Sequence, residues 1–139
     1  MSLTKLGWND AWETAFAPHR AAGFVPARVA VEDKHHFRIW TADSELTAKV
    51  TGRLLHESRR DRSQLPKVGD WAVVKVVANE EKAVIQAVLP RRTQLSRKMT
   101  GRDTEEQILA TNIDLAFVVV AADASFVACS RTTHVSGAS

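Results

Sequence analysis

Basic side chains in two clusters are the residues of this sequence best suited to binding a ligand. Residues 89–102, which we expect to form a loop, hold five cations and no acid. Residues 52–67 hold five more cations, with Glu57 and Asp61 among them. The planar guanidinium of arginine matches phosphate oxygens and also stacks on nucleic-acid bases. The clusters therefore predict contacts with a phosphate backbone, and the alternative is a solvated surface with local ion pairs. The candidate RNA-binding residues are Arg53, Arg59, Arg60, Arg62, Lys67, Arg91, Arg92, Arg97, Lys98 and Arg102.

Sequence patterns for catalysis and metal binding are absent. No glycine precedes a lysine, so there is no phosphate-binding loop of the Walker type. His35 and His36 are adjacent and would point to opposite faces of a strand. Cys129 is the single cysteine, which excludes an internal disulfide and the usual multi-cysteine zinc site. We predict no catalytic residue, no metal ligand and no cofactor-binding residue in these 139 residues.

The charge of the chain is unevenly distributed. Residues 1–102 carry 18 lysines and arginines against 11 acids, whereas residues 103–139 carry one arginine and five acids. A basic body predicts an anionic partner, most often nucleic acid. The N-terminus lacks the apolar region of a signal peptide, and the longest apolar run is too short to span a membrane. We expect a cytoplasmic, monomeric protein without a membrane partner.

A short helix is predicted before the first strand, over about residues 9–17. Asp10 and Glu13 have the spacing of a capping box, with Asp10 as the N-cap. Trp12 and its neighbours form an apolar face that would pack on a sheet. Pro18 is predicted to end the helix.

Five short strands are predicted over about residues 27–89. Three alternating runs (27–33, 36–42 and 46–52) read as a meander, and a hairpin over 70–89 follows a long polar connection. This arrangement favours a five-stranded OB-fold-like barrel over a sandwich, with an SH3-like barrel as the alternative. Trp40 shares a face with Arg38, so it either packs on the sheet or offers a platform for a stacked base.

The C-terminal part of the sequence has a different character. Residues 103–111 are compatible with one or two helical turns. Residues 115–122 are continuously apolar, which is typical of a strand buried between two layers of an α/β sheet. No layers follow, so we expect an orphan strand. Residues 127–139 lack periodicity and are predicted to be a disordered tail.

Several strings along the chain resemble one family. In the same order and spacing, they are similar to the N-terminal part of the ribosome small-subunit-dependent GTPase A family, the circularly permuted GTPases of bacterial ribosome assembly. The resemblance covers about residues 3–126. The strings are LGW (6–8), PARV (26–29), VTGR (50–53), LPKVGDW (65–71), VLPRRTQLSRK (88–98) with Gly101, and EQILATNID (106–114).

This resemblance implies a domain organisation. Residues 1–102 would be an OB-fold RNA-binding domain, within which residues 66–71 shape the barrel. The basic segment that contains Arg91, Arg92, Arg97 and Lys98 would link the barrel to a GTPase domain. Residues 103–126 would be a linker and the first strand of that missing α/β domain, and residues 127–139 depart from the family pattern. We expect a truncated or frameshifted product, or a partial gene model.

The resemblance also implies a function. The chain would be the rRNA- and small-subunit-binding module of a ribosome-biogenesis GTPase that acts in late small-subunit maturation. Hydrolysis of GTP, and binding of GTP, magnesium and zinc, are implied only for the full-length family, because the phosphate-loop, switch and guanine-reading motifs are missing here. We expect no GTPase activity from these residues alone. The alternative function is a generic barrel that binds a protein partner and has no RNA role.

Overall fold

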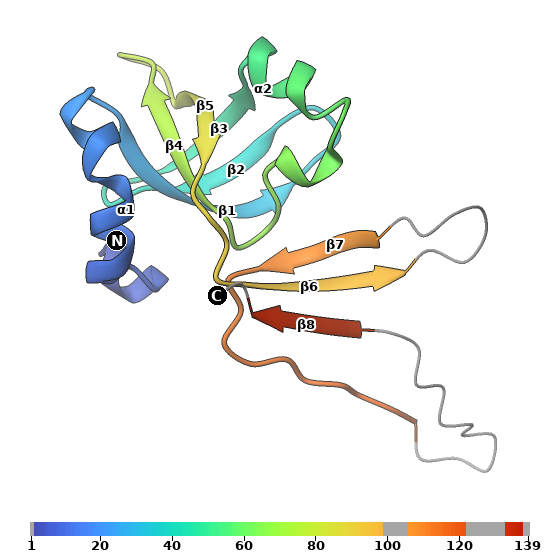
Figure 1. The fold of residues 1–139 in the computed structure, drawn as a ribbon. Helices are drawn as coiled ribbons and strands as arrows, with labels where there is room; N and C mark the ends of the chain where they lie inside the picture. Colours follow the sequence, from blue (N-terminus) through green and yellow to red (C-terminus); the bar gives the residue numbers. More distant parts are fainter. Residues whose placement is uncertain (1, 99–105, 122–132, 138–139) are drawn as a thin grey trace.

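A closed five-stranded barrel forms the centre of the molecule (Figure 1). The computed structural model describes residues 2–98, 106–121 and 133–137. The strands follow one another around the barrel in the order β1-β2-β3-β5-β4, and β4 pairs with β1 to close it. They are β1 (Val25–Glu32), β2 (Phe37–Trp40), β3 (Glu45–Val50), β4 (Trp71–Val76) and β5 (Lys82–Val88).

The pairing pattern identifies the kind of barrel. All neighbouring strands are antiparallel except β3 and β5, which run parallel. This Greek-key closure is the arrangement of the OB fold. The predicted fold class is confirmed, and the strand order decides between the two barrel types that periodicity left open.

Alternation along the strands fills the barrel. In β2 and β3 buried and exposed positions alternate, so Ile39 and Ala48 point inward while Arg38 and Thr47 do not. The interior cluster also contains Val29 and other fully buried aliphatic side chains. Each buried aliphatic side chain of this size contributes about 1.5–3 kcal/mol of transfer free energy.

Helix α1 (Asp10–Ala21) follows the short 3-10 helix η1 (Leu3–Leu6) and packs outside the barrel. Its buried side chains Trp12 and Phe16 form a second apolar cluster with Trp71. Two details of the prediction were wrong. The N-cap is Asn9, whose side chain accepts a hydrogen bond from the Trp12 backbone N–H at 3.1 Å. Pro18 lies inside the helix on an exposed surface, where packing of the opposite face outweighs one missing hydrogen bond.

The connection from β3 to β4 is partly helical. It contains α2 (Gly52–Glu57) and the 3-10 helix η2 (Arg62–Gln64), where the sequence predicted only a polar connection. Thr51 caps α2 by accepting from the Leu54 backbone N–H at 3.2 Å. Asp61 caps η2 by accepting from the backbone N–H and hydroxyl of Ser63. Both helical pieces therefore have conventional N-caps.

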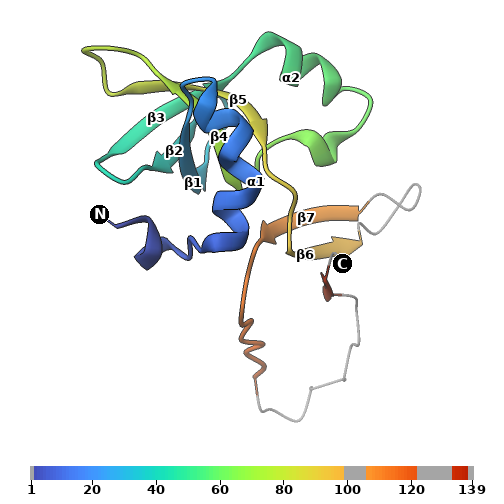
Figure 2. The ribbon, with the colours of Figure 1, turned by 60° about the vertical axis from the view of Figure 1, so that its left-hand side comes forward.

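A second sheet projects from the barrel, as Figures 1 and 2 show. It has the order β7-β6-β8, with β6 (Thr93–Lys98), β7 (Glu106–Thr111) and β8 (Thr133–Gly137). The basic segment was expected as a loop and the 103–111 segment as helical turns, but β6 and β7 are strands that form an antiparallel hairpin. In β7, exposed Gln107 and Leu109 alternate with half-buried Ile108 and Ala110, which is the period of a strand.

The structure also differs from the prediction in the C-terminal part. Residues 133–137, expected to be disordered, pair with β6 as β8. Residues 115–121 are not a strand, and the apolar side chains of Phe117 and Val119 are 85% and 93% exposed. Residue 122 lies outside the described residues. No neighbouring strand pairs with this segment in the described part of the chain, so the backbone pairing that would define a strand is missing there.

Within the described residues, no helix combines the length and hydropathy needed to cross a membrane.

Candidate nucleic-acid interface

The order of the strands gathers the basic residues at one end of the barrel. Strands β1, β3 and β5 end where β2 and β4 begin. The β3–β4 connection (residues 51–70) and the segment after β5 (residues 89–98) therefore start at the same end, which we call the basic end. These two segments carry nine cations and three acids. The fold thus joins the two clusters that are separate in sequence.

The opposite end of the barrel is acidic. It contains the β2–β3 and β4–β5 connections with their flanking residues, 41–45 and 77–82, which we call the acidic end. These residues carry four acids and one cation, Lys82. The barrel is therefore electrostatically polar along its axis, and an anionic ligand is attracted to one end and repelled from the other.

Most of the predicted residues are exposed at the basic end. Arg59, Arg60 and Arg62 are exposed and form no ion pair within residues 2–98, 106–121 and 133–137. Arg53 is 80% exposed and pairs with Glu57 at 3.3 Å, a surface pair worth about 0–1 kcal/mol. These four guanidinium groups are accessible to a ligand.

The hairpin adds further exposed cations. Arg92, Arg97 and Lys98 are exposed on or just before β6. Arg97 makes one long contact of 3.5 Å with the side-chain oxygen of Gln107 on β7. Arg102 lies outside the described residues. The hairpin and the β3–β4 connection lie on the same side of the barrel in both views (Figures 1 and 2).

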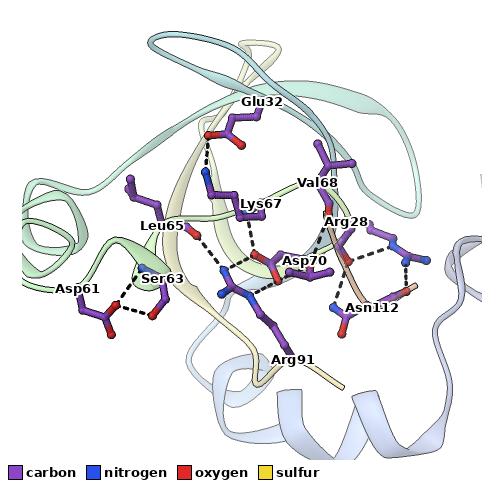
Figure 3. A network of polar contacts seen from close by, with 12 residues as sticks. Arg28, Glu32, Asp61, Ser63, Leu65, Lys67, Val68, Asp70, Arg91 and Asn112 are labelled. Carbon is purple, nitrogen blue, oxygen red and sulfur yellow. Dashed lines mark hydrogen bonds and ion pairs between the residues drawn. The ribbon is translucent and has the colours of Figure 1, made fainter. Parts of the chain in front are cut away.

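Two of the predicted residues are engaged within the protein. The Lys67 ammonium lies 2.9 Å from a Glu32 carboxylate oxygen. Arg91 is only 13% exposed and forms a two-pronged ion pair with fully buried Asp70, with both N–H···O distances at 2.9 Å (Figure 3). The same guanidinium donates to the Leu65 carbonyl oxygen at 2.9 Å. Arg91 therefore holds the β3–β4 connection against the segment that leaves β5.

Asp70 is the centre of this network. Besides Arg91, its carboxylate accepts hydrogen bonds from the Lys67 backbone N–H and the Thr111 hydroxyl, both at 2.7 Å. A buried carboxylate is tolerated only when it is paired and hydrogen-bonded in this way. Sequence reasoning missed the role of Asp70, although the VGDW string pointed to it.

Gly69 brings the barrel and the hairpin into close contact. Its φ is +97°, and a Cβ built there would lie 2.0 Å from the Thr111 carbonyl oxygen. The Thr111 backbone N–H donates to the Val68 carbonyl oxygen at 2.9 Å, and the Asn112 side-chain amide donates to the Gly69 carbonyl oxygen at 3.1 Å. Asn112 in turn accepts from the Arg92 backbone N–H at 2.8 Å. Backbone and side chain together fix β6 and β7 to the basic end.

Arg28 is a further residue that sequence reasoning missed. Its guanidinium donates to the carbonyl oxygens of Leu6, Gly69 (3.2 Å) and Asn112 (2.9 Å), and it lies over the Trp71 ring. Burial lowers the pKa of Arg28, and nearby carboxylates oppose this shift. Because its donors are used within the protein, Arg28 is a structural cation. The PARV string contained it, but its partners are distant in sequence.

The face of β2 and β3, which OB folds commonly use for ligands, is mixed in charge here. Trp40 is half-buried, and its indole N–H donates to a Glu45 carboxylate oxygen at 3.2 Å. The other Glu45 oxygen pairs with Arg38 at 3.0 Å. Trp40 is thus tied to an acid at the acidic end of the barrel.

Fold and charge together define the class of this protein: an OB-fold domain with one basic end, to which a β-hairpin is anchored. No family model matches the chain. Curated proteins named "Small ribosomal subunit biogenesis GTPase RsgA" are similar to it. The protein of Opitutus terrae is 44% identical over 134 residues, which cover 91% of this chain and 36% of that relative.

Two further relatives with the same name give a similar match. The protein of Streptomyces coelicolor is 36% identical over 86% of this chain and 31% of its own length. That of Syntrophotalea carbinolica is 36% identical over 86% of this chain and 34% of its own length. The chain therefore spans about a third of the length of the curated relatives it matches. This similarity is consistent with the N-terminal part of the relatives, and it confirms the resemblance seen in the sequence.

Proposed function

We propose that the chain is the rRNA-binding module of a ribosome-biogenesis GTPase, and that it docks on the small ribosomal subunit in the cytoplasm during late maturation. The names of the relatives support a role with this subunit. The observation that carries the RNA-binding part is the basic end of the barrel. There, Arg59, Arg60 and Arg62 are exposed without an acidic partner among the described residues, beside the basic strand β6.

The exposure of the side chains supports a narrower set of proposed RNA contacts. We assign RNA contacts to the exposed cations of the basic end. Arg91 does not contact RNA in this proposal but supports the segment that carries them. Arg91 and Asp70 fix the connection that bears the three arginines, and Thr111 ties the hairpin to the same carboxylate. Because these segments are already fixed in the free protein, binding does not incur the entropy cost of ordering them.

The relatives are named as GTPases. We propose that GTP hydrolysis is carried by the part of those proteins beyond the third that this chain matches, because this sequence has no glycine–lysine phosphate loop. In this proposal the chain acts as a monomer and positions the GTPase on the small ribosomal subunit.

Co-sedimentation with purified small ribosomal subunits tests the proposal. The wild-type chain should bind at low salt and less at moderate salt, because phosphate contacts release counterions. The variant Arg59→Ala/Arg60→Ala/Arg62→Ala and the variant Arg92→Ala/Arg97→Ala/Lys98→Ala should each lose most of the bound fraction. The control Lys75→Ala/Lys82→Ala removes exposed cations from the last residues of β4 and the first of β5 and should bind normally.

The alternative function, binding of a protein partner without an RNA role, predicts a different result. Binding would then be insensitive to salt and unaffected by both arginine variants. That result, or absence of binding at low salt, would contradict the proposal.

A further inference from the structure

We infer that the basic end takes double-helical RNA through its phosphates, and not single-stranded RNA through stacked bases. This inference rests on the proposed function and narrows its substrate class. Three features of the structure lead to it: the position of the aromatic side chains, the rigidity of the basic segments and the placement of the acids.

Aromatic side chains are absent from the basic end. Residues 51–70 and 89–98 contain no tryptophan, phenylalanine or tyrosine. Trp12, Trp71 and Phe16 are at most 4% exposed in the cluster under α1, and Trp40 is tied to Glu45 at the acidic end. Proteins that bind single strands use exposed aromatics as stacking platforms worth about 1–3 kcal/mol per base. The basic end offers cations without such platforms.

The cations are carried on two fixed supports. The β3–β4 connection is capped at Thr51 and Asp61 and is held by Arg91 at Leu65. The hairpin is held by Thr111 and Asn112, and β6 extends about 20 Å along its six residues. A support of fixed geometry suits a ligand whose phosphates also have fixed spacing, which is how duplex RNA is recognised by shape.

The acidic end opposes the path that a single strand would use on an OB fold. That path follows β2 and β3 with the β1–β2 and β4–β5 connections. Asp43, Glu45, Glu80 and Glu81 border it here. A phosphate backbone along this path meets four acids and one cation at residues 41–45 and 77–82, whereas the basic end carries nine cations and three acids.

Fluorescence anisotropy with the full chain tests the inference. The probes are an RNA duplex of about 20 base pairs, long enough for the footprint of a duplex-binding domain, one of its strands chosen to be unstructured, and a duplex of scrambled sequence. Both duplexes should bind equally, and about tenfold or more tighter than the single strand.

Arg59→Ala/Arg60→Ala should weaken duplex binding about tenfold, Arg59→Lys/Arg60→Lys should retain most of it, and Lys75→Ala/Lys82→Ala should leave it unchanged. Trp40→Leu, which removes the aromatic ring, should also have no effect on duplex binding.

The outcomes separate the inference from the proposed function. Tighter binding of the single strand, or loss of binding in Trp40→Leu, would overturn the inference and leave an RNA-binding module. Failure of every RNA probe together with failure to co-sediment with small subunits would overturn the proposed function itself. Failure of the probes with intact, salt-sensitive binding to subunits would overturn only the recognition of a simple duplex.

Discussion

At the scale of single residues, the role of each arginine is decided by the acid it meets. Arg91 and Arg92 are adjacent, yet Arg91 pairs with buried Asp70 while Arg92 is exposed. The sequence does not distinguish the roles of the two arginines, because Asp70 is 21 residues from Arg91 and the two meet only when the barrel has folded. Residue type and clustering therefore predicted the basic surface, whereas the division into supporting and exposed cations needed the structure.

The pair Arg91 and Arg92 allows a direct comparison of stability. Arg91→Ala leaves the Asp70 carboxylate buried without its cation and should lower the free energy of unfolding by about 3–5 kcal/mol. Arg92→Ala removes an exposed charge and should change it by less than about 0.5 kcal/mol. Urea unfolding followed by tryptophan fluorescence measures both. Equal effects of the two variants would show that the ion pair does not support the fold.

The cap of η2 gives a prediction about pH. The hydroxyl and backbone N–H of Ser63 donate to the Asp61 carboxylate and hold its pKa below the ordinary value of 3.8. A carboxyl whose pKa is lower in the folded state stabilises the fold above its unfolded pKa, and this contribution is lost as pH falls through the folded pKa. Ser63→Ala should raise the pKa of Asp61 in an NMR titration, whereas Thr47→Ala on β3 should not. An unchanged pKa in Ser63→Ala would contradict this account of the cap.

At the scale of elements, local periodicity predicted the barrel strands, whose side chains fill the core. It missed the β6–β7 hairpin, which is held in place by contacts with residues distant in sequence. The five barrel strands alternate clearly and were predicted close to their observed bounds. Strand β6 carries polar and basic residues over most of its length, so its pattern indicated a loop. Its pairing with β7 and its place at the barrel depend on Thr111 and Asn112, whose partners lie about 20 to 40 residues away. Such contacts leave no local signal.

The anchoring of the hairpin can be tested at Gly69. Gly69→Ala should cost about 1–2 kcal/mol for the positive φ, and about 1–3 kcal/mol more because the new Cβ meets the Thr111 carbonyl oxygen. Gly23 is the matched control, since its φ is +89° but no atom would lie within 4 Å of a Cβ at that position. Thermal unfolding should therefore show a larger loss for Gly69→Ala than for Gly23→Ala, with reduced amide protection in β6 and β7. Equal losses at both glycines would mean that the close approach is not needed.

At the scale of the whole molecule, the barrel topology gathers charges that are scattered along the sequence into a basic end and an acidic end. Along the chain, the β1–β2 connection, the β3–β4 connection and the segment after β5 lie at one end, and they alternate with the β2–β3 and β4–β5 connections at the other. The two charged surfaces are therefore not apparent before the strand order is known. The net charge of +3 understates this polarity. We expect the field of the whole barrel to orient the proposed RNA partner before any single arginine makes contact.

This polarity predicts the salt dependence of RNA binding. Each phosphate that a cation neutralises contributes about 0.9 to the slope of log affinity against log salt on a duplex, by analogy with DNA. Arg59→Ala/Arg60→Ala should therefore make the slope about 2 shallower, whereas Lys75→Ala/Lys82→Ala should leave it unchanged. Anisotropy titrations at several salt concentrations measure both slopes. A similar change in the two variants would mean that binding depends on net charge alone, and an unchanged slope in the arginine variant would place the phosphates elsewhere on the molecule. A selective change is expected because the basic end gathers the exposed arginines of the β3–β4 connection, whereas Lys82 lies among the acids of the opposite end.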